Sequence, residues 1–364
     1  MMQKNKRTNL TGNIREVLEQ RILCGELPPG SSMPSNAILA EEFGVSLLTA
    51  NRAVQQLVKA GLVYRQQGRG SFVCPDLPGR KKYRIGIADK ISYPVVPLRE
   101  AALDIRPRTS MRYLREHDCE VRLLDYEEVR DREILFREAE NLDGIIMSSG
   151  YLDPVTAENL QQLRIPSVVN LHEWVSEWSV DQVIVDNAPG MRQAAERIVR
   201  EDCPEIIVVY EDHRNGCIRK RMFCDAMTAA GFPAEKIREI QVEEWAIQSG
   251  VPSFQLGMRL SREIRGKWLF STSDIVSFAM LAAFLETGLT AGKDFQLISY
   301  DNLEGYGYQP LGEPFLTSID CPKIRIAERS AELLLDKIQH PANETVIIRI
   351  PSSLVIRKSA FSRN

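Results

Sequence analysis

Histidine is scarce in this chain, and its cysteines have no metal-binding spacing. Of 364 residues four are His, and none of the seven Cys belongs to a C-x-x-C pair. The imidazoles are far apart in sequence, so neither a zinc site nor a Cys–His nucleophile is expected. We predict no metal, no cofactor and no catalytic residue, and reduced thiols as in a cytosolic protein. The residues are His117, His172, His213 and His340, with Cys24, Cys74, Cys119, Cys203, Cys217, Cys224 and Cys321.

Long apolar runs are also missing. No stretch approaches the roughly 20 residues that span a bilayer, and the N-terminal residues MMQKNKRTN lack the apolar core of a secretion signal. A hydrophobic fraction of 44% with 26% charged residues is ordinary for a globular protein. We therefore predict a cytoplasmic protein without a membrane partner, long enough for two or three domains.

Acidic residues are few at the start of the chain. The first 82 residues contain 12 Lys and Arg but only 6 Asp and Glu, a net charge of +6. Because the whole chain has a net charge of −3, the remainder has −9. A basic head on an acidic body indicates that only the head meets a polyanion.

Residues 34–73 contain two short helical patterns, each with its own start signal and a glycine as its stop. Ser35 can cap the first helix and Ser46 the second. In the second helix, apolar residues at i, i+4, i+7 and i+8 fall on one face. Two short strands around a glycine-containing turn follow, at residues 62–65 and 71–73. This pattern predicts a helix-turn-helix followed by a β-wing.

The run from Ile14 to Val73 resembles the winged helix-turn-helix of the GntR family of bacterial transcription regulators. The elements G-x-L-x-P-G, L-A-x-x-F-G-V-S and G-x-G-S-F-V fall in register without a gap, and a further helix is predicted over residues 10–25. The resemblance implies double-stranded operator DNA as a partner. A major groove roughly 12 Å wide admits one helix, and the helix from Ser46 to Ala60 is the candidate reader.

The predicted DNA-binding residues lie around the start of that helix and at the tip of the wing. Asn51 is expected to pair bidentately with adenine, and Arg52 to bind guanine or phosphate. Arg69, between two glycines, can enter the minor groove or hold a phosphate. For Leu47 and Leu48, contact with thymine methyl groups and packing in the core are both open. The full set is Ser35, Ser46, Leu47, Leu48, Thr49, Asn51, Arg52, Gln67, Gly68, Arg69 and Gly70.

The sequence departs from the family pattern at positions that read bases. The family often carries arginine where Ala37, Leu47 and Asn51 stand here. The arginine-to-guanine contacts of relatives therefore do not transfer, and we expect this chain to have a base preference of its own.

Residues 75–82 read as a linker, because they hold two prolines, a glycine and three basic residues. From Tyr83 on, short Val- and Ile-rich strands alternate with helices, which predicts parallel sheets covered on both faces. The order of LDGIIMSSG, IPSVVN, VIVDN and FQLISYDN is similar to that in the ligand-binding core of the LacI/GalR regulators. The predicted fold is α/β: a winged helix-turn-helix domain over residues 1–74 and a periplasmic-binding-protein-like core over 83–360. This combination is similar to that of arabinose-responsive repressors.

That core fold has two lobes joined by three chain crossings. We place lobe 1 at about residues 83–180 and 316–340, and lobe 2 at about 181–315 and 341–360. Ligands of such sheets bind between the lobes at the carboxyl ends of the strands. Three prolines are expected to break the helix that follows the first strand in the family, namely Pro94, Pro97 and Pro107.

The predicted effector-binding residues follow the strands or lie between the lobes. Arg219 matches the family's effector-binding arginine, and with Asp274 and Asp301 it can bracket vicinal hydroxyls through bonds of about 1.5–3 kcal/mol each. The alternative is a structural ion pair at the lobe seam. Asn187 binds ligand or caps a helix, and Trp174 stacks on a sugar ring or packs at a lobe or dimer contact. The full set is Asp89, Ser149, Tyr151, Asn170, Trp174, Asn187, Arg219, Asp274 and Asp301.

These features predict a ligand-responsive, sequence-specific DNA-binding transcriptional regulator that acts as a homodimer and represses carbohydrate-utilisation genes. A small sugar-like effector between the lobes would change the spacing of the two reading heads. Two alternatives stay open: a cytoplasmic solute-binding protein and an enzyme on the same two-lobed fold. The winged head argues against the first. The sequence of the core has no evident nucleophile–base pair or phosphate loop, so we predict that the protein is not an enzyme.

Overall fold

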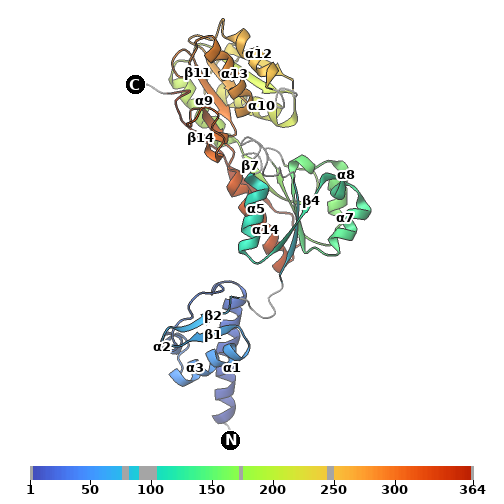
Figure 1. Ribbon diagram of the computed structural model, residues 1–364, viewed down its shortest axis with the longest axis vertical. Helices are drawn as coiled ribbons and strands as arrows, with labels where there is room; N and C mark the ends of the chain where they lie inside the picture. The colour runs from blue at the N-terminus through green and yellow to red at the C-terminus, as the bar shows by residue number, and fades with distance from the viewer. Residues whose placement is uncertain (1–2, 76–81, 90–104, 172–174, 244–249, 362–364) are drawn as a thin grey trace. The chain divides into compact units, whose positions relative to one another are not determined.

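The computed structural model describes residues 3–75, 82–89, 105–171, 175–243 and 250–361. The chain divides into two compact units, Met1–Lys82 and Tyr83–Asn364, which we call the head and the core. Each unit has hydrophobic clusters of its own, and each is described by itself (Figure 1).

The head is built from three helices and a two-stranded antiparallel wing among its described residues. Ile14, Leu18 and Ile22 recur every four residues on the first helix and are buried against the third helix. Both predicted serine caps are present: Ser35 accepts a hydrogen bond from the Ile38 N–H and Ser46 one from the Thr49 N–H. The elements are α1 (Gln3–Leu23), α2 (Asn36–Glu42), α3 (Leu47–Lys59), β1 (Val63–Gln66) and β2 (Gly70–Val73).

The first lobe of the core has a six-stranded parallel sheet in the order β13-β7-β6-β5-β3-β4. Helices α5 and α14 cover one face and α7 and α8 the other (Figure 1). The strands are β3 (Arg84–Ala88), β4 (Glu120–Leu124), β5 (Gly144–Ser148), β6 (Ser167–Leu171), β7 (Asp181–Asp186) and β13 (Ile347–Pro351). The helices are α5 (Ile105–Glu116), α6 (Tyr126–Arg130), α7 (Arg132–Ala139), η1 (Ser149–Tyr151), α8 (Pro154–Gln161) and α14 (Lys323–Gln339).

The second lobe has a six-stranded sheet in the order β14-β12-β11-β10-β8-β9, parallel except for the β12–β14 pair. Alternation along β8 places Ile206 and Val208 against α9 and α10, and Ile207 and Val209 against α12 and α13. The strands are β8 (Ile206–Glu211), β9 (Ile237–Val242), β10 (Trp268–Ser271), β11 (Gln296–Tyr300), β12 (Thr317–Asp320) and β14 (Ser353–Val355). The helices are α9 (Ala188–Arg200), α10 (Arg214–Ala229), η2 (Ala234–Lys236), α12 (Val251–Leu260), α13 (Asp274–Glu286) and η3 (Leu303–Tyr306).

The three lobe crossings differ from the predicted positions. Strand β7 pairs with β6 and β13, so residues 181–186 and 347–351 belong to lobe 1 rather than lobe 2. Strand β12 pairs with β11 and β14, so residues 317–320 belong to lobe 2 rather than lobe 1. The cause is backbone pairing, since a strand stays with the neighbours that satisfy its N–H and C=O groups.

We predicted that Pro107 breaks the helix after the first strand, and for Pro107 this prediction was wrong. Pro107 lies at the third position of α5, where a proline removes no intrahelical hydrogen bond. Pro94 and Pro97 lie outside the described residues.

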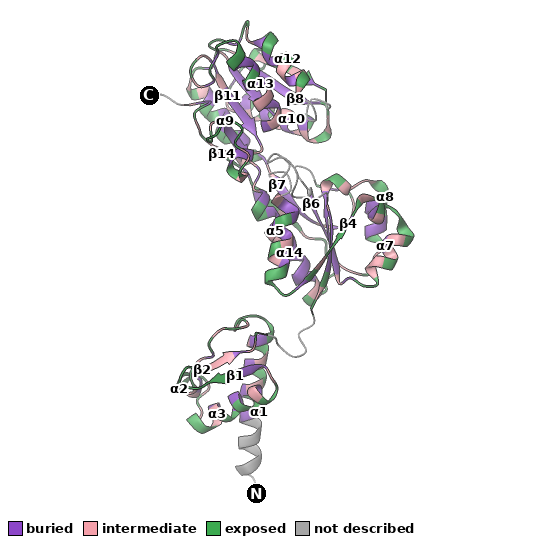
Figure 2. Cartoon of the chain, in the orientation of Figure 1, coloured by how far each residue is buried: buried purple, intermediate pink, exposed green. Residues whose placement is uncertain are grey.

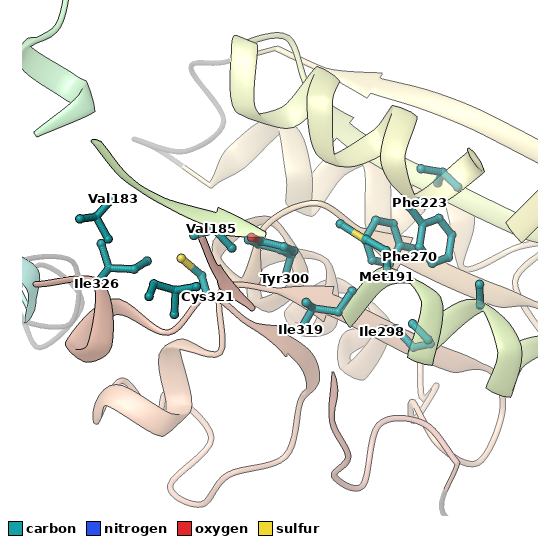
Figure 3. Packing of buried hydrophobic residues seen from close by; sticks show 14 of the residues in the cluster. Val183, Val185, Met191, Phe223, Phe270, Ile298, Tyr300, Ile319, Cys321 and Ile326 are labelled. Atoms are coloured by element: carbon teal, nitrogen blue, oxygen red, sulfur yellow. The ribbon is translucent and has the colours of Figure 1, made fainter. Parts of the chain in front are cut away.

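Buried side chains line both core sheets, whereas the first strand of the wing is largely exposed (Figure 2). One apolar cluster is shared by the two lobes. It runs from Val183 and Ile326 in lobe 1, past Tyr300, to Phe223 and Phe270 in lobe 2 (Figure 3). The polar residues at the carboxyl ends of the lobe 2 strands are therefore set at the edge of a packed apolar framework.

Candidate functional site

The start of α3 and the tip of the wing form the first candidate site, which we call the reading surface. Leu47 and Leu48 are 59% and 58% exposed, so neither packs in the core of the head. Arg52 is exposed, as are all four residues at the wing tip. The reading surface comprises Leu47, Leu48, Thr49, Asn51, Arg52, Gln67, Gly68, Arg69 and Gly70.

Two of the predicted DNA-binding serines are occupied within the head. Ser35 and Ser46 each use their hydroxyl oxygen to cap a helix, at 3.3 and 3.2 Å. The Ser46 hydroxyl also pairs with that of Thr49 at 2.8 Å. Both serines therefore set the start of a helix.

Asn51 is held by two residues that the sequence did not single out for DNA contact. Its Oδ1 accepts a hydrogen bond from Arg65 Nη2 at 2.5 Å and one from Asn36 Nδ2 at 3.4 Å. Arg65 lies on β1, two residues after the buried Val63, and so on the face of the strand that packs toward α3. That spacing could have identified Arg65 from the sequence.

The second candidate site is a polar cluster around Arg219 in lobe 2. Arg219, 5% exposed on α10, donates to the Thr272 carbonyl at 2.8 Å and pairs with Asp301 Oδ1 at 3.4 Å. Its guanidinium carbon lies 4.0 Å from the centre of the Tyr300 ring. These contacts fix the plane of the guanidinium at the carboxyl ends of β10 and β11.

Asp301 is shared by two cations. Besides Arg219, the buried Lys323 at the start of α14 lies 3.7 Å from Asp301 Oδ1 and donates to the Asp301 carbonyl at 2.8 Å. The backbone of Asp301 has a φ of 112°, which non-glycine residues rarely adopt. Lys323 was missed by the sequence, although it stands at the crossing from lobe 2 to lobe 1.

Asp274 has a structural role rather than the ligand-bracketing role we predicted. It is fully buried, and its two oxygens accept hydrogen bonds from the Leu303 N–H at 2.7 Å and the Ser318 hydroxyl at 2.8 Å. Burial raises the pKa of Asp274 from 3.8 to about 7, and the nearby Asp301 adds to the rise. Asp274 thus positions the turn after β11 that carries Asp301.

Asn187 joins the two lobes at the end of β7. Its Oδ1 accepts a hydrogen bond from the Tyr300 hydroxyl at 2.5 Å, and its side chain makes no cap hydrogen bond to α9. Among the described residues, its buried Nδ2 donates to no protein acceptor. Asn187 therefore does not cap α9 through its side chain. Its buried Nδ2 can donate a hydrogen bond to an acceptor outside the described residues, such as a ligand.

The predicted residues of lobe 1 lie at the carboxyl ends of β3, β5 and β6. Asp89 and Ser149 are half-buried, and Tyr151 packs edge-on against Tyr126 with ring centres 5.5 Å apart. Asn170 is buried, and its Oδ1 accepts from Arg106 Nη1 at 3.3 Å. Trp174 lies outside the described residues.

Two further buried charges at the strand ends escaped the sequence. Arg106, 9% exposed, lies in the first turn of α5, a region set aside because of its prolines. Glu211, 1% exposed, ends β8 and accepts a hydrogen bond from the Thr272 hydroxyl at 2.5 Å. Asp301 was selected because it follows the last residue of a strand. Had the last residue of each strand been included as well, Glu211 would have been found.

Fold and sites define a two-unit protein: a winged helix-turn-helix head with an exposed reading helix, and a two-lobed α/β core with polar strand ends. Residues 10–73 match the profile of the bacterial regulatory proteins of the gntR family, and residues 195–360 that of the periplasmic binding protein-like domain. The chain therefore joins a head similar to the gntR-family domain to a core similar to the periplasmic binding protein-like domain.

The curated relatives that the chain resembles are named as transcriptional regulators. The chain is 24% identical over 228 residues to the HTH-type transcriptional regulator CelR of Thermobifida fusca, covering 60% of this chain and 64% of the relative. It is 30% identical over 224 residues to the HTH-type transcriptional repressor PurR of Shigella dysenteriae, covering 60% and 63%. The chain thus spans less than two thirds of the length of these curated relatives.

Solved structures confirm the fold of the core. A LacI family transcriptional regulator from Enterococcus faecium, with bound ribose, matches with a TM-score of 0.59 at 22% identity, over 76% of this chain and 98% of that one. A periplasmic binding protein/LacI transcriptional regulator from Alkaliphilus metalliredigens, complexed with D-xylulofuranose, matches with 0.56 at 18% identity, over 77% and 100%. In the described part of the present chain, no helix has the length and apolarity needed to cross a membrane.

Proposed function

We propose that this protein is a ligand-responsive, sequence-specific DNA-binding transcriptional regulator. It represses carbohydrate-utilisation genes and responds to a small sugar-like effector. The observation that carries the proposal is the pairing of two sites in separate units. One is an exposed reading helix on a basic head, and the other is a buried Arg219–Asp301 pair at the strand ends of the core.

The head supports DNA as its partner through shape and charge. The start of α3 is exposed, and a single helix of this kind fits the major groove. The net charge of +6 over the first 82 residues attracts phosphates, and the exposed Arg69 at the wing tip is suited to hold one. The repressor named among the relatives adds to this support.

The core supports a polyhydroxylated effector. Asp301 offers carboxylate oxygens and Arg219 offers N–H donors on one side of the lobe seam, an arrangement that suits neighbouring hydroxyl groups. Asn187 holds a buried N–H donor for which the described residues offer no acceptor. Asp89, Ser149, Tyr151 and Asn170 complete the proposed site from lobe 1. The ribose and D-xylulofuranose bound by structures of similar fold agree with this ligand class.

The regulator acts as a homodimer in the cytoplasm. Winged helix-turn-helix heads read half-sites about one helical turn apart, which requires two heads held at a set spacing. Effector binding shifts the core toward one arrangement of its lobes and so changes that spacing. Ligand-free and ligand-bound proteins should therefore differ in operator affinity.

Two measurements on the full chain test the proposal. The first selects bound duplexes from a random-sequence library, and we expect one sequence class to be enriched. The second measures thermal shifts with ribose, xylose, arabinose, glucose and common disaccharides. We expect at least one to raise the melting temperature and to change the affinity for the selected duplex. No enrichment, or turnover of the bound sugar, would contradict the proposal.

Arg219→Ala is the variant that links the sugar to its site. We expect sugar binding to weaken by about 1.5–3 kcal/mol, the contribution of a hydrogen bond to a charged group. DNA binding without sugar should be retained. Arg200→Ala is the matched control, because that arginine side chain is 76% exposed on α9. An unchanged sugar shift in Arg219→Ala would remove Arg219 from the site.

A further inference from the structure

The hydrogen bonds around Asn51 fix which of its atoms can meet a base. A guanidinium has only donors, so the atom of Asn51 that faces Arg65 Nη2 at 2.5 Å must be its oxygen. The Asn36 Nδ2 lies 3.4 Å from the same oxygen, and this second donor occupies its other acceptor direction. Among the described residues the Asn51 Nδ2 donates no hydrogen bond to the protein, and its N–H donors point away from both partners of the oxygen.

An asparagine in this state cannot make the contact usually expected of it. Bidentate pairing with adenine needs the amide oxygen to accept from the adenine N6 amino group while the amide nitrogen donates to N7. Here the oxygen is already engaged. An amide nitrogen alone has two N–H donors and no acceptor, so it favours guanine, which presents the neighbouring acceptors N7 and O6, whereas adenine presents N7 beside the N6 donor.

We infer that Arg65 is a specificity-determining residue: by occupying the Asn51 oxygen, it leaves Asn51 only N–H donors and so makes Asn51 select guanine over adenine. The inference rests on the proposed DNA-binding function and corrects our expectation of an Asn51–adenine pair. The contact that this chain makes with the base would then differ from that of relatives with arginine at the position of Asn51, because a short neutral amide replaces a long, charged guanidinium side chain.

Arg65 can keep this contact on DNA. It is exposed on β1, and its guanidinium has five N–H donors, so it can hold a phosphate and the Asn51 oxygen together. A charge-assisted hydrogen bond also strengthens when the approaching duplex displaces water from it. The competing arrangement, in which a phosphate draws Arg65 away, would release the Asn51 oxygen and restore adenine pairing.

Selection from a random-sequence duplex library with full-length variants tests the inference. Asn51→Ala identifies the position that Asn51 reads, because preference at that position alone should collapse. In the wild-type protein that position should favour guanine over adenine by roughly fivefold or more. In Arg65→Met, which keeps the length of the stem but removes every donor, the preference should move to adenine.

Arg65→Lys is the rescue variant, since its ammonium can still donate to the Asn51 oxygen. It should keep the guanine preference. Both Arg65→Met and Arg65→Lys should also lose affinity across all sequences, to different extents. Adenine in the wild-type selection overturns the inference, as does an unchanged preference in Arg65→Met or no affected position in Asn51→Ala. If the wild-type protein enriches no sequence, the proposed function itself has failed, and the inference falls with it.

Discussion

Several side chains of the reading surface are exposed to solvent, whereas the polar cluster in lobe 2 holds side chains that are buried and bonded to other protein groups. On the reading surface, Leu47 and Leu48 are more than half exposed, and Arg52 is exposed too. In the lobe 2 cluster, Arg219 and Asp274 are buried, and each has at least two protein partners. A side chain with few partners can be changed for its effect on binding alone. A side chain inside a network acts on stability as well, so its variants need controls for folding.

The largest expected effect is on the free energy of unfolding of the core, in the variant Asp274→Ala. Removal of the carboxylate leaves the Leu303 N–H and the Ser318 hydroxyl without their acceptor in a fully buried site. Each unsatisfied buried group is unfavourable by about 1–3 kcal/mol, so we expect a loss on the order of 4 kcal/mol in the free energy of unfolding. All four tryptophans lie after residue 82, so tryptophan fluorescence during urea unfolding follows the core.

Asp336→Ala is the matched control for this measurement. Its side chain is 66% exposed, and surface substitutions of this kind usually stay within about 0.5 kcal/mol. Equal effects of the two alanine variants would show that the Asp274 network contributes nothing to the stability of lobe 2.

The next effect is a pH dependence of the stability of the core, caused by Asp274. Burial raises the pKa of Asp274 from 3.8 to about 7 in the folded protein. The folded state then binds this proton more tightly than the unfolded state, so ionisation opposes folding. The contribution is fully present below pH 3.8 and is lost as the pH rises through 7. Between pH 5 and pH 8 we expect a loss of about 3 kcal/mol.

Other groups also titrate over this range, so the prediction concerns the difference between two proteins. Urea midpoints of the wild type and of Asp274→Asn at both pH values isolate the contribution of Asp274. The wild type should lose stability toward pH 8, and the variant should lose about 3 kcal/mol less. Parallel pH profiles would mean that Asp274 is ionised at both pH values.

Local signals in the sequence were enough to predict most elements that carry the two sites. Ser35 and Ser46 cap the helices we expected, because a cap depends only on residues three positions apart. Short Val- and Ile-rich runs predicted strands such as β5 and β8. By contrast, Pro107 misled us, since the sequence alone did not say that it falls in the first turn of a helix.

Contacts between distant segments could not be predicted in this way. Lys323 reaches the Asp301 carbonyl across 22 positions, and Arg106 reaches Asn170 across 64. Strand β7 has the same apolar pattern whichever sheet it joins, so its pattern did not place the lobe crossing. The sequence named Asp274 as a polar residue after a strand, but only the structure shows that both of its oxygens are occupied.

The smallest effect concerns Leu48 on the reading surface, where stability and binding should separate cleanly. Leu48 is 58% exposed, so Leu48→Ala should leave the free energy of unfolding within about 0.5 kcal/mol of the wild type. If Leu48 covers a thymine methyl group in the major groove, the variant should bind the selected duplex about 1 kcal/mol more weakly. Leu285→Ala, changed at a leucine 53% exposed on α13, should bind the duplex normally.

Replacement of single thymines by uracil in the selected duplex identifies the methyl group involved. Each replacement removes one methyl group and no hydrogen-bonding atom, so it tests apolar contact alone. At the contacted position, the wild-type protein should lose affinity while Leu48→Ala loses none, because the two changes remove the same contact. Additive losses at every thymine would instead mean that Leu48 acts on the duplex without touching a methyl group, and the parallel test would then pass to Leu47.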